Sequence, residues 1–182
     1  PAISGEKGSG TIFFSLCSMR CVYCQNHKFS QASVGKIVSE KELADIMLNL
    51  QGKGCHNINL VNPTHYVPQI VGALAIAYSK GLNLPIVYNT GGYDSLETIK
   101  ALKGVIDIYL PDMKYSDNSM ALRYSNADKY VENNIRIIEE MYKQVGHLKD
   151  YRGIAEKGII IRLLILPNDV AGINTTLDNI TK

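Results

Sequence analysis

The chain has 182 residues, 46% of them hydrophobic and 20% charged, which predicts one sizeable core and a single domain spanning residues 1–182. With 19 Lys and Arg against 17 Asp and Glu and no charge run, neither a nucleic-acid partner nor a membrane-surface partner is expected. The longest apolar run is too short to span a bilayer, and no charged leader precedes a hydrophobic segment. Three of the four Cys share one short loop, which favours a reducing compartment. We therefore expect a cytoplasmic protein.

Both ends of the sequence carry a prediction. Residues 1–9 are rich in Gly and Ser and predict a loose lead-in. The sequence begins at Pro1 and ends inside what resembles the start of a helix at residues 175–182. We expect a piece of a longer protein, with a further strand lying beyond Lys182.

A loop with three cysteines follows the first predicted strand. Residues 11–16 are apolar, β-branched and aromatic, which predicts a buried strand, and Cys17, Cys21 and Cys24 come directly after it. Three thiolates on one short loop can hold three corners of a cubane iron–sulfur cluster. No fourth Cys lies nearby, so one position would stay open to bind and activate another molecule.

Two other interpretations of this loop remain open. His27 could complete a zinc site with the three Cys, or the three thiols could be unconnected buried residues. Cys55 stands alone before a strand, and we expect a small buried residue there and not a fourth ligand.

Helices and strands alternate through the rest of the chain. Ser39 and Glu42 form a predicted capping box, and apolar residues then recur at helical spacing until Gly52. Further strands are predicted at residues 57–61, 84–90, 105–110 and 158–166. Between the fourth and fifth strands, residues 115–157 predict a polar insertion of two helices.

This alternation predicts an α/β fold. Strands that are hydrophobic along their whole length belong in a parallel sheet covered by helices. The chain is too short for an eight-unit barrel of ~250 residues. We therefore predict a partial parallel (β/α) barrel.

Polar residues end successive strands, and barrel chemistry collects at that carboxyl edge. The candidates are Asn62, Thr64, Asn89, Thr90, Asp112, Lys114 and Arg162. Each has an alternative role, because single Asn and Thr residues commonly cap turns. Asp107 and Arg162 could likewise form an internal ion pair with no ligand.

The Cys-x3-Cys-x2-Cys spacing, with aromatic Tyr23 before the last Cys, resembles the signature of the radical S-adenosylmethionine (SAM) superfamily. The resemblance implies an open TIM-like (β/α)6 barrel and a [4Fe–4S] cluster on Cys17, Cys21 and Cys24. It also implies that SAM chelates the fourth iron and that Tyr23 lies near the adenine.

Longer strings are similar to the radical SAM proteins related to pyruvate formate-lyase activating enzyme. They include Cys-Val-Tyr-Cys-Gln-Asn, Leu-Val-Asn-Pro-Thr-His and Leu-Pro-Asp-Met-Lys-Tyr. Two departures stand out. The second strand ends in Asn-Pro-Thr-His where the activating enzymes have Gly-Gly-Glu-Pro, and Leu16 and Ser18 flank the first Cys where Gly and Asn are expected.

The resemblance also implies roles for the residues at the strand ends. Asn62 and Thr64 would offer acceptors to the amino group of SAM, and Asn89 and Thr90 would reach its methionine or ribose part. Asp112 and Lys114 end the fourth strand, and Lys114 would pair with the SAM carboxylate. Arg162 would contact the same carboxylate in bidentate fashion.

The implied chemistry is reductive cleavage of SAM to a 5′-deoxyadenosyl radical, which abstracts a hydrogen atom. The expected partner is a glycyl radical enzyme such as pyruvate formate-lyase, with a flavodoxin- or ferredoxin-type electron donor. Two alternatives stay open: a radical SAM enzyme acting on a small molecule or another peptide, and a zinc-stabilised binding module without catalysis.

Overall fold

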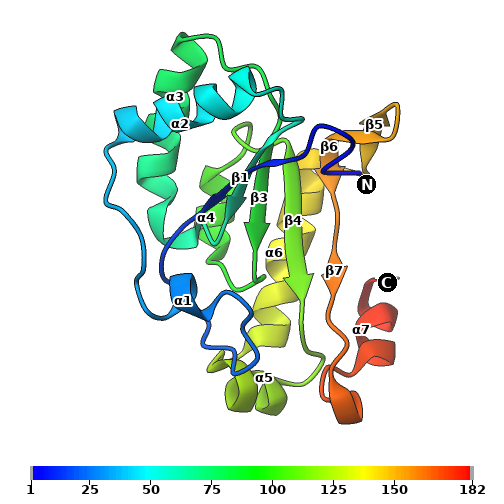
Figure 1. Cartoon of the computed structure of the whole chain (residues 1–182). Coiled ribbons are helices and arrows are strands. Elements are labelled where there is room, and N and C mark those ends of the chain that lie inside the picture. The colour runs from blue at the N-terminus through cyan, green and yellow to red at the C-terminus, as the bar shows by residue number, and fades with distance from the viewer. Residues whose placement is uncertain (1, 181–182) are drawn as a thin grey trace.

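The structure, a computed structural model, describes residues 2–180, so the domain limits predicted at residues 1 and 181–182 lie outside the described residues. Its centre is a mainly parallel sheet with the strand order β1-β2-β3-β4-β6-β5, and β7 pairs with β4 (Figure 1). The strands are β1 (Gly10–Phe13), β2 (Ile58–Val61), β3 (Ile86–Thr90), β4 (Ile108–Met113), β5 (Lys149–Tyr151), β6 (Ile154–Ile159) and β7 (Arg162–Leu163). The predicted α/β class is confirmed.

Helices connect the strands. They are α1 (His27–Ser30), α2 (Glu40–Gly52), α3 (Val67–Ser79), α4 (Leu96–Ala101), α5 (Asn118–Ser125), α6 (Tyr130–Val145) and α7 (Ile173–Ile180). Short 3-10 turns occur at Thr64–Tyr66 and Pro167–Asp169. None of the helices within residues 2–180 has both the length and the apolar character needed to cross a bilayer.

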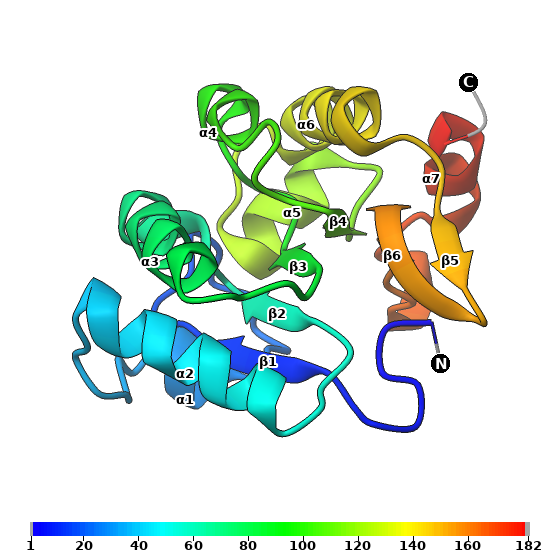
Figure 2. The ribbon, with the colours of Figure 1, turned by 90° about the horizontal axis from the view of Figure 1, so that it is seen from above.

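The sheet is curved like part of a barrel wall. Figure 2 shows the strands as an arc, with α2, α3, α4 and α6 along its outer side. β1, β2, β3 and β4 pair in parallel, and β4 then pairs in parallel with β6 and with β7. The described residues thus form the predicted partial (β/α) barrel, with β6 and β7 sharing its fifth position. The sixth strand expected for a (β/α)6 barrel is not among residues 2–180.

The main core lies between the sheet and the outer helices. β2 and β3 are buried at every position, as expected for strands covered on both faces. Met47 of α2 and Leu74 of α3 are fully buried against them. This packing holds the strands in register, so their carboxyl ends meet at one edge.

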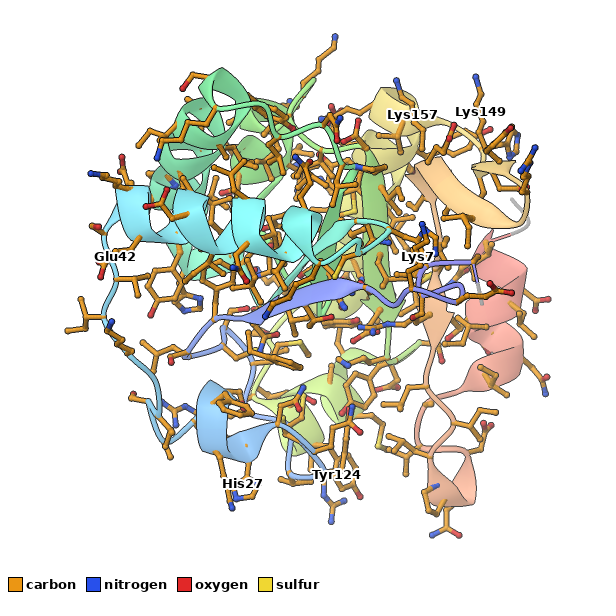
Figure 3. All side chains as sticks on the ribbon, turned by 45° about the horizontal axis from the view of Figure 1, so that its top comes forward. Lys7, His27, Glu42, Tyr124, Lys149 and Lys157 are labelled. Atoms are coloured by element: carbon orange, nitrogen blue, oxygen red, sulfur yellow. The ribbon has the colours of Figure 1, made fainter. Side chains whose placement is uncertain are left out.

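The predicted capping box at the start of α2 is confirmed. The Glu42 backbone N–H donates to Ser39 Oγ at 3.2 Å, and the Ser39 N–H donates to Glu42 Oε2 at 2.8 Å. Glu42 itself is labelled in Figure 3, near the amino end of α2. The Ser39 hydroxyl also donates to Glu42 Oε2 at 2.9 Å, and the hydrogen bonds from the Ser39 N–H and hydroxyl lower the pKa of the Glu42 carboxyl.

We expect Ser39→Ala to lower the free energy of unfolding by about 1 kcal/mol, because the Glu42 N–H loses its acceptor and the Glu42 carboxylate loses the hydrogen bond from the Ser39 hydroxyl. Urea denaturation of the apo protein measures this loss. Ser79→Ala is the matched control, since Ser79 Oγ only donates back to the Ile76 carbonyl near the end of α3. Equal stability of the two variants would contradict a role of the capping box in holding α2.

The bounds predicted for the fifth strand are wrong. A single strand was expected at residues 158–166, but β6 begins at Ile154, ends at Ile159, and is followed by the separate β7. β6 also forms an antiparallel hairpin with β5 through a turn at Arg152 and Gly153, both at positive φ. The range 115–157 therefore holds α5, α6 and most of this hairpin, and not two helices alone.

The lead-in is more ordered than expected. The Ala155 N–H donates to the Ala2 carbonyl at 2.7 Å, and the His56 N–H donates to the Gly8 carbonyl at 3.0 Å. Ala2 and Ile3 also pack against a small core cluster that contains Ile108. Residues 2–8 thus close the amino end of the partial barrel, and the prediction of a loose segment was wrong there.

Candidate functional site

A pocket of about 450 Å³ opens at the carboxyl ends of the strands. The Cys loop and α1 lie at this end of the sheet, together with α5 (Figure 1). The pocket is lined by every predicted site residue except Thr64, namely Cys17, Cys21, Tyr23, Cys24, Asn62, Asn89, Thr90, Asp112, Lys114 and Arg162. Residues far apart in the sequence therefore converge here because parallel strands end at one edge.

The Cys loop is held in place by backbone hydrogen bonds to α5. The Arg20 N–H donates to the Ser125 carbonyl at 2.7 Å, and the Val22 N–H donates to the Tyr124 carbonyl at 2.9 Å. Figure 3 shows Tyr124 at this end of the molecule. The loop is thus tied to the carboxyl end of a helix about 100 residues further along the chain.

Leu16 stands where the resemblance led us to expect glycine, before the first Cys. Its φ is 70°, in the left-handed region that costs a residue with a Cβ roughly 1–2 kcal/mol. The Leu16 N–H donates to the Phe29 carbonyl at 2.9 Å, so the turn forms despite the strain. Ser18, the second departure, donates from Oγ to the Tyr93 carbonyl at 3.2 Å. Neither departure removes a thiol from the pocket.

The three loop thiols are free and partly exposed, and each has a polar neighbour. Ser125 Oγ donates to Cys21 Sγ at 3.0 Å, the Met19 N–H donates to Cys17 Sγ at 3.5 Å, and Ser30 Oγ lies 3.3 Å from Cys24 Sγ. Burial raises the pKa of the Cys17 thiol, so a bound metal must supply the charge that makes it a thiolate.

A preformed zinc site is not present in the described part of the chain. No three His, Cys, Asp or Glu side chains within residues 2–180 are arranged to hold one metal ion. His27, the proposed fourth zinc ligand, is exposed and points away from the sheet (Figure 3). Cys55 is half-buried and, as expected, does not line the pocket.

Gly91 and Gly92 follow β3, and close packing within the chain requires glycine at Gly92. Gly92 has a φ of 75°, and a Cβ there would collide with the Asn134 side chain and the Asp112 carbonyl. Gly91, in contrast, lines the pocket. Gly92 therefore makes the sharp turn, and Gly91 offers backbone to a ligand.

A buried carboxylate fixes this turn. Asp94 is 3% exposed and accepts hydrogen bonds from Tyr88 (2.8 Å), Thr90 (2.5 Å) and Thr64 (2.6 Å). Thr64 therefore does not reach the pocket, and its predicted contact with a ligand is replaced by this structural bond. Thr90 has both roles, because it lines the pocket while its hydroxyl is anchored to Asp94.

Lys114 and Arg162, which were predicted to bind the SAM carboxylate, both already pair with the carboxylate of Asp112. Lys114 Nζ lies 2.5 Å from Asp112 Oδ2, and Arg162 Nε donates to Asp112 Oδ1 at 2.7 Å. The alternative pairing of Arg162 with Asp107 is wrong, since Asp107 accepts the Ile86 N–H at 2.9 Å. Lys114, Arg162 and Asp112 together carry one excess positive charge at the edge of the pocket, which suits a ligand carboxylate.

Sequence reasoning missed several lining residues. Thr11 and Asn59 lie on β1 and β2 and face the pocket, and Asn89 Nδ2 donates to Asn59 Oδ1 at 3.3 Å. Met19 of the Cys loop also lines it and is 2% exposed. The available signal was a polar residue inside an apolar strand, which applies to Asn59.

The donor set fits a cluster with SAM beside it. Three thiols line one pocket, and Cys thiolates are the usual ligands of the irons of a [4Fe–4S] cluster. Amide, hydroxyl and charged groups line the remaining wall, where they can contact the amino, carboxylate and ribose groups of SAM.

Comparisons with known proteins agree with this site. The family model described as the radical SAM superfamily matches residues 11–149. The curated protein "Uncharacterized protein MJ0674" of Methanocaldococcus jannaschii is 32% identical over 169 residues, which are 88% of this chain and 45% of that protein. The chain thus spans about half the length of this relative.

Solved structures share the fold. Methylornithine synthase (PylB) has a TM-score of 0.61 at 16% identity, covering 94% of this chain and 49% of that one. A structure of anSMEcpe with bound AdoMet and Cp18Cys peptide has a TM-score of 0.61 at 13% identity, covering 95% and 47%. Radical SAM proteins use a [4Fe–4S] cluster and SAM, the two cofactors that the donor set fits. By its fold, its three loop cysteines and the match over residues 11–149, the chain belongs to the radical SAM superfamily.

Proposed function

We propose that the chain is the radical SAM domain of an enzyme that activates a glycyl radical enzyme such as pyruvate formate-lyase. The observation that carries the proposal is the pocket in which three free thiols face the polar ends of β2, β3 and β4. The activase assignment is supported by the long strings shared with pyruvate formate-lyase activating enzyme-related proteins. When bound, the cluster and SAM supply a 5′-deoxyadenosyl radical.

The chain's own residues would bind and orient these groups. Cys17, Cys21 and Cys24 would hold three irons as thiolates. Asn62 would accept a hydrogen bond from the SAM ammonium, and Asn89 and Thr90 would reach its methionine or ribose part. Fixed polar groups at the strand ends would also replace water around the bound cofactor.

The carboxylate of SAM would be held at the Asp112 group. Lys114 and Arg162 together exceed the charge of Asp112 by one, so an added carboxylate completes the neutralisation. Arg162 presents its remaining N–H groups, since only Nε is used by Asp112. Tyr23 lines the same pocket and would contact the adenine with its ring.

The hydrogen atom would come from the α-carbon of a Gly in a partner protein. A peptide is compatible with this kind of fold, because the anSMEcpe structure is described with a bound peptide. A flavodoxin- or ferredoxin-type protein would supply the electron. The four free cysteines support a reducing, cytoplasmic location.

The test is anaerobic reconstitution of the chain with iron and sulfide, followed by incubation with SAM, dithionite and a candidate glycyl radical enzyme. We expect 5′-deoxyadenosine and a glycyl radical signal in electron spin resonance. A reconstituted chain that cleaves SAM but produces no glycyl radical in any glycyl radical enzyme of its host would contradict the activase assignment.

A second candidate is a radical SAM enzyme that acts on a small molecule or another peptide. It is favoured by the end of β2, where Asn62 has a φ of 56° and lines the pocket while Thr64 binds Asp94. This arrangement lacks the Gly-Gly-Glu-Pro of the activating enzymes. Substrate-dependent 5′-deoxyadenosine release with a small molecule, in the absence of any protein partner, would favour this candidate.

A further inference from the structure

A buried serine on α5 donates a hydrogen bond to one of the loop thiols. Ser125 is the last residue of α5 and is 0% exposed, and its Oγ lies 3.0 Å from Cys21 Sγ. Its carbonyl also accepts the Arg20 N–H at 2.7 Å, so helix and Cys loop are fixed relative to each other. Of the three loop thiols, Cys21 has the shortest hydrogen bond, against 3.5 Å at Cys17 and 3.3 Å at Cys24.

Two tyrosines continue this hydrogen bond into a chain. Tyr115 OH lies 2.7 Å from Ser125 Oγ, and Tyr23 OH lies 2.6 Å from Tyr115 OH. Each hydroxyl carries one hydrogen, and a thiolate can only accept. Tyr23 OH also lies 3.4 Å from Ser125 Oγ, a longer contact than that of Tyr115. Once Cys21 is a thiolate, Ser125 donates to it, and the two shorter contacts make Tyr115 the main donor to Ser125 and Tyr23 the donor to Tyr115.

All hydrogen bonds in this row point toward the Cys21 sulfur, so together they stabilise negative charge on it. Consecutive hydrogen bonds pointing the same way polarise one another, and the effect is larger away from water. Tyr115 is 2% exposed and Ser125 is 0% exposed, so the donors are shielded from solvent. Neither hydroxyl belongs to the pocket lining. Ser125 and Tyr115 thus act on the thiolate from outside the pocket, whereas Tyr23, at the far end of the hydrogen-bond chain, lines it.

We propose that Ser125, oriented by Tyr115 and Tyr23, raises the reduction potential of the cluster by hydrogen bonding to the Cys21 thiolate. A reduced cluster carries one more electron than the oxidised form, so a donor at sulfur stabilises it more. Ser125 and Tyr115 are therefore positioning residues that act through Cys21. The inference rests on the cluster site of the proposed function but not on the identity of the substrate.

The test measures the midpoint potential of the cluster in the whole, reconstituted chain, by electron spin resonance during a redox titration without SAM or partner. We expect Ser125→Ala to shift the reduction equilibrium toward the oxidised cluster by up to about tenfold, which is about 59 mV for one electron. Tyr115→Phe keeps the ring but removes the donor at 2.7 Å from Ser125 Oγ, so that only Tyr23 OH at 3.4 Å remains, and it should shift the equilibrium in the same direction by less.

Tyr93→Phe is the matched control. Tyr93 stacks on Tyr130 at 6.0 Å beside the same aromatic cluster, but its hydroxyl donates to the Asp128 carbonyl and takes no part in the chain. The midpoint potential of the cluster in the Tyr93→Phe variant should equal that in the unaltered protein. If Ser125→Ala binds a full cluster whose midpoint potential is unchanged, the proposal is overturned. If Ser125→Ala holds no cluster, an unchanged midpoint potential in Tyr115→Phe overturns it instead. Because no partner is present, a failure of the activase assignment leaves this measurement unaffected.

Discussion

Replacing any one of Cys17, Cys21 or Cys24 with Ala lowers SAM cleavage by more than about 100-fold and removes most of the bound iron. Changes to residues that only support metal ligands already cost roughly 10–100-fold, so loss of a ligand costs more. All three thiols line the same pocket. Cys55, the remaining Cys, does not line it and so cannot replace any of them. The measurements are iron and sulfide content after anaerobic reconstitution, and 5′-deoxyadenosine formed from SAM with dithionite.

Cys55→Ala is the control for this series. Cys55 is a free thiol of similar exposure, but it lies outside the pocket lining. It should keep the iron content and the activity of the unaltered chain. A Cys17→Ala variant that binds a full cluster and cleaves SAM would contradict the assignment of the three ligands.

Replacing Asp94 with Ala destabilises the protein by about 3 kcal/mol, because hydrogen bonds to charged groups are worth about 1.5–3 kcal/mol each and are not additive. Three hydroxyls, from Thr64, Tyr88 and Thr90, lose their common acceptor in a nearly dry environment. Urea denaturation of the apo protein gives the stability. Because Thr90 lines the pocket, SAM binding by the reconstituted protein should weaken as well.

Two variants separate this effect from a general loss of charge. Asp94→Asn keeps one acceptor oxygen and should lose less stability than Asp94→Ala. Asp45→Ala removes an exposed carboxylate that pairs with Lys80 at 2.7 Å and should leave stability unchanged within error. Stability losses of equal size in Asp94→Ala and Asp45→Ala would show that the buried hydrogen bonds contribute nothing.

Features set by neighbours in the sequence were predicted well. The capping box at Ser39 and Glu42 needs only residues three positions apart, and the structure forms it as expected. The strands β2 and β3 were likewise recognised from their mainly hydrophobic runs, because such runs have few other stable locations. The alternation of these elements with helices sufficed to predict the α/β class and the partial barrel.

Errors arose where distant segments meet. The lead-in was expected to be loose, yet residues 2–8 bond to residues near Asn57 and Ala155, which no local pattern reveals. The hairpin of β5 and β6 was missed because its strands are short and its turn, Arg152-Gly153, resembles a loop in composition. An ion pair of Arg162 with Asp107 was one alternative that the sequence left open, while the sheet register sets Arg162 opposite Asp112.

The sequence by itself determined the kind of chemistry, because three cysteines on one loop and polar residues at strand ends are local patterns with few alternative uses. Only the tertiary structure decided which polar groups reach the pocket. Thr64 turns away to Asp94, whereas Asn59 enters from a strand interior. It also brought Ser125 against Cys21 across 104 positions of chain. Side-chain direction and long-range contact depend on how the strands and helices pack, and packing is a property of the whole fold.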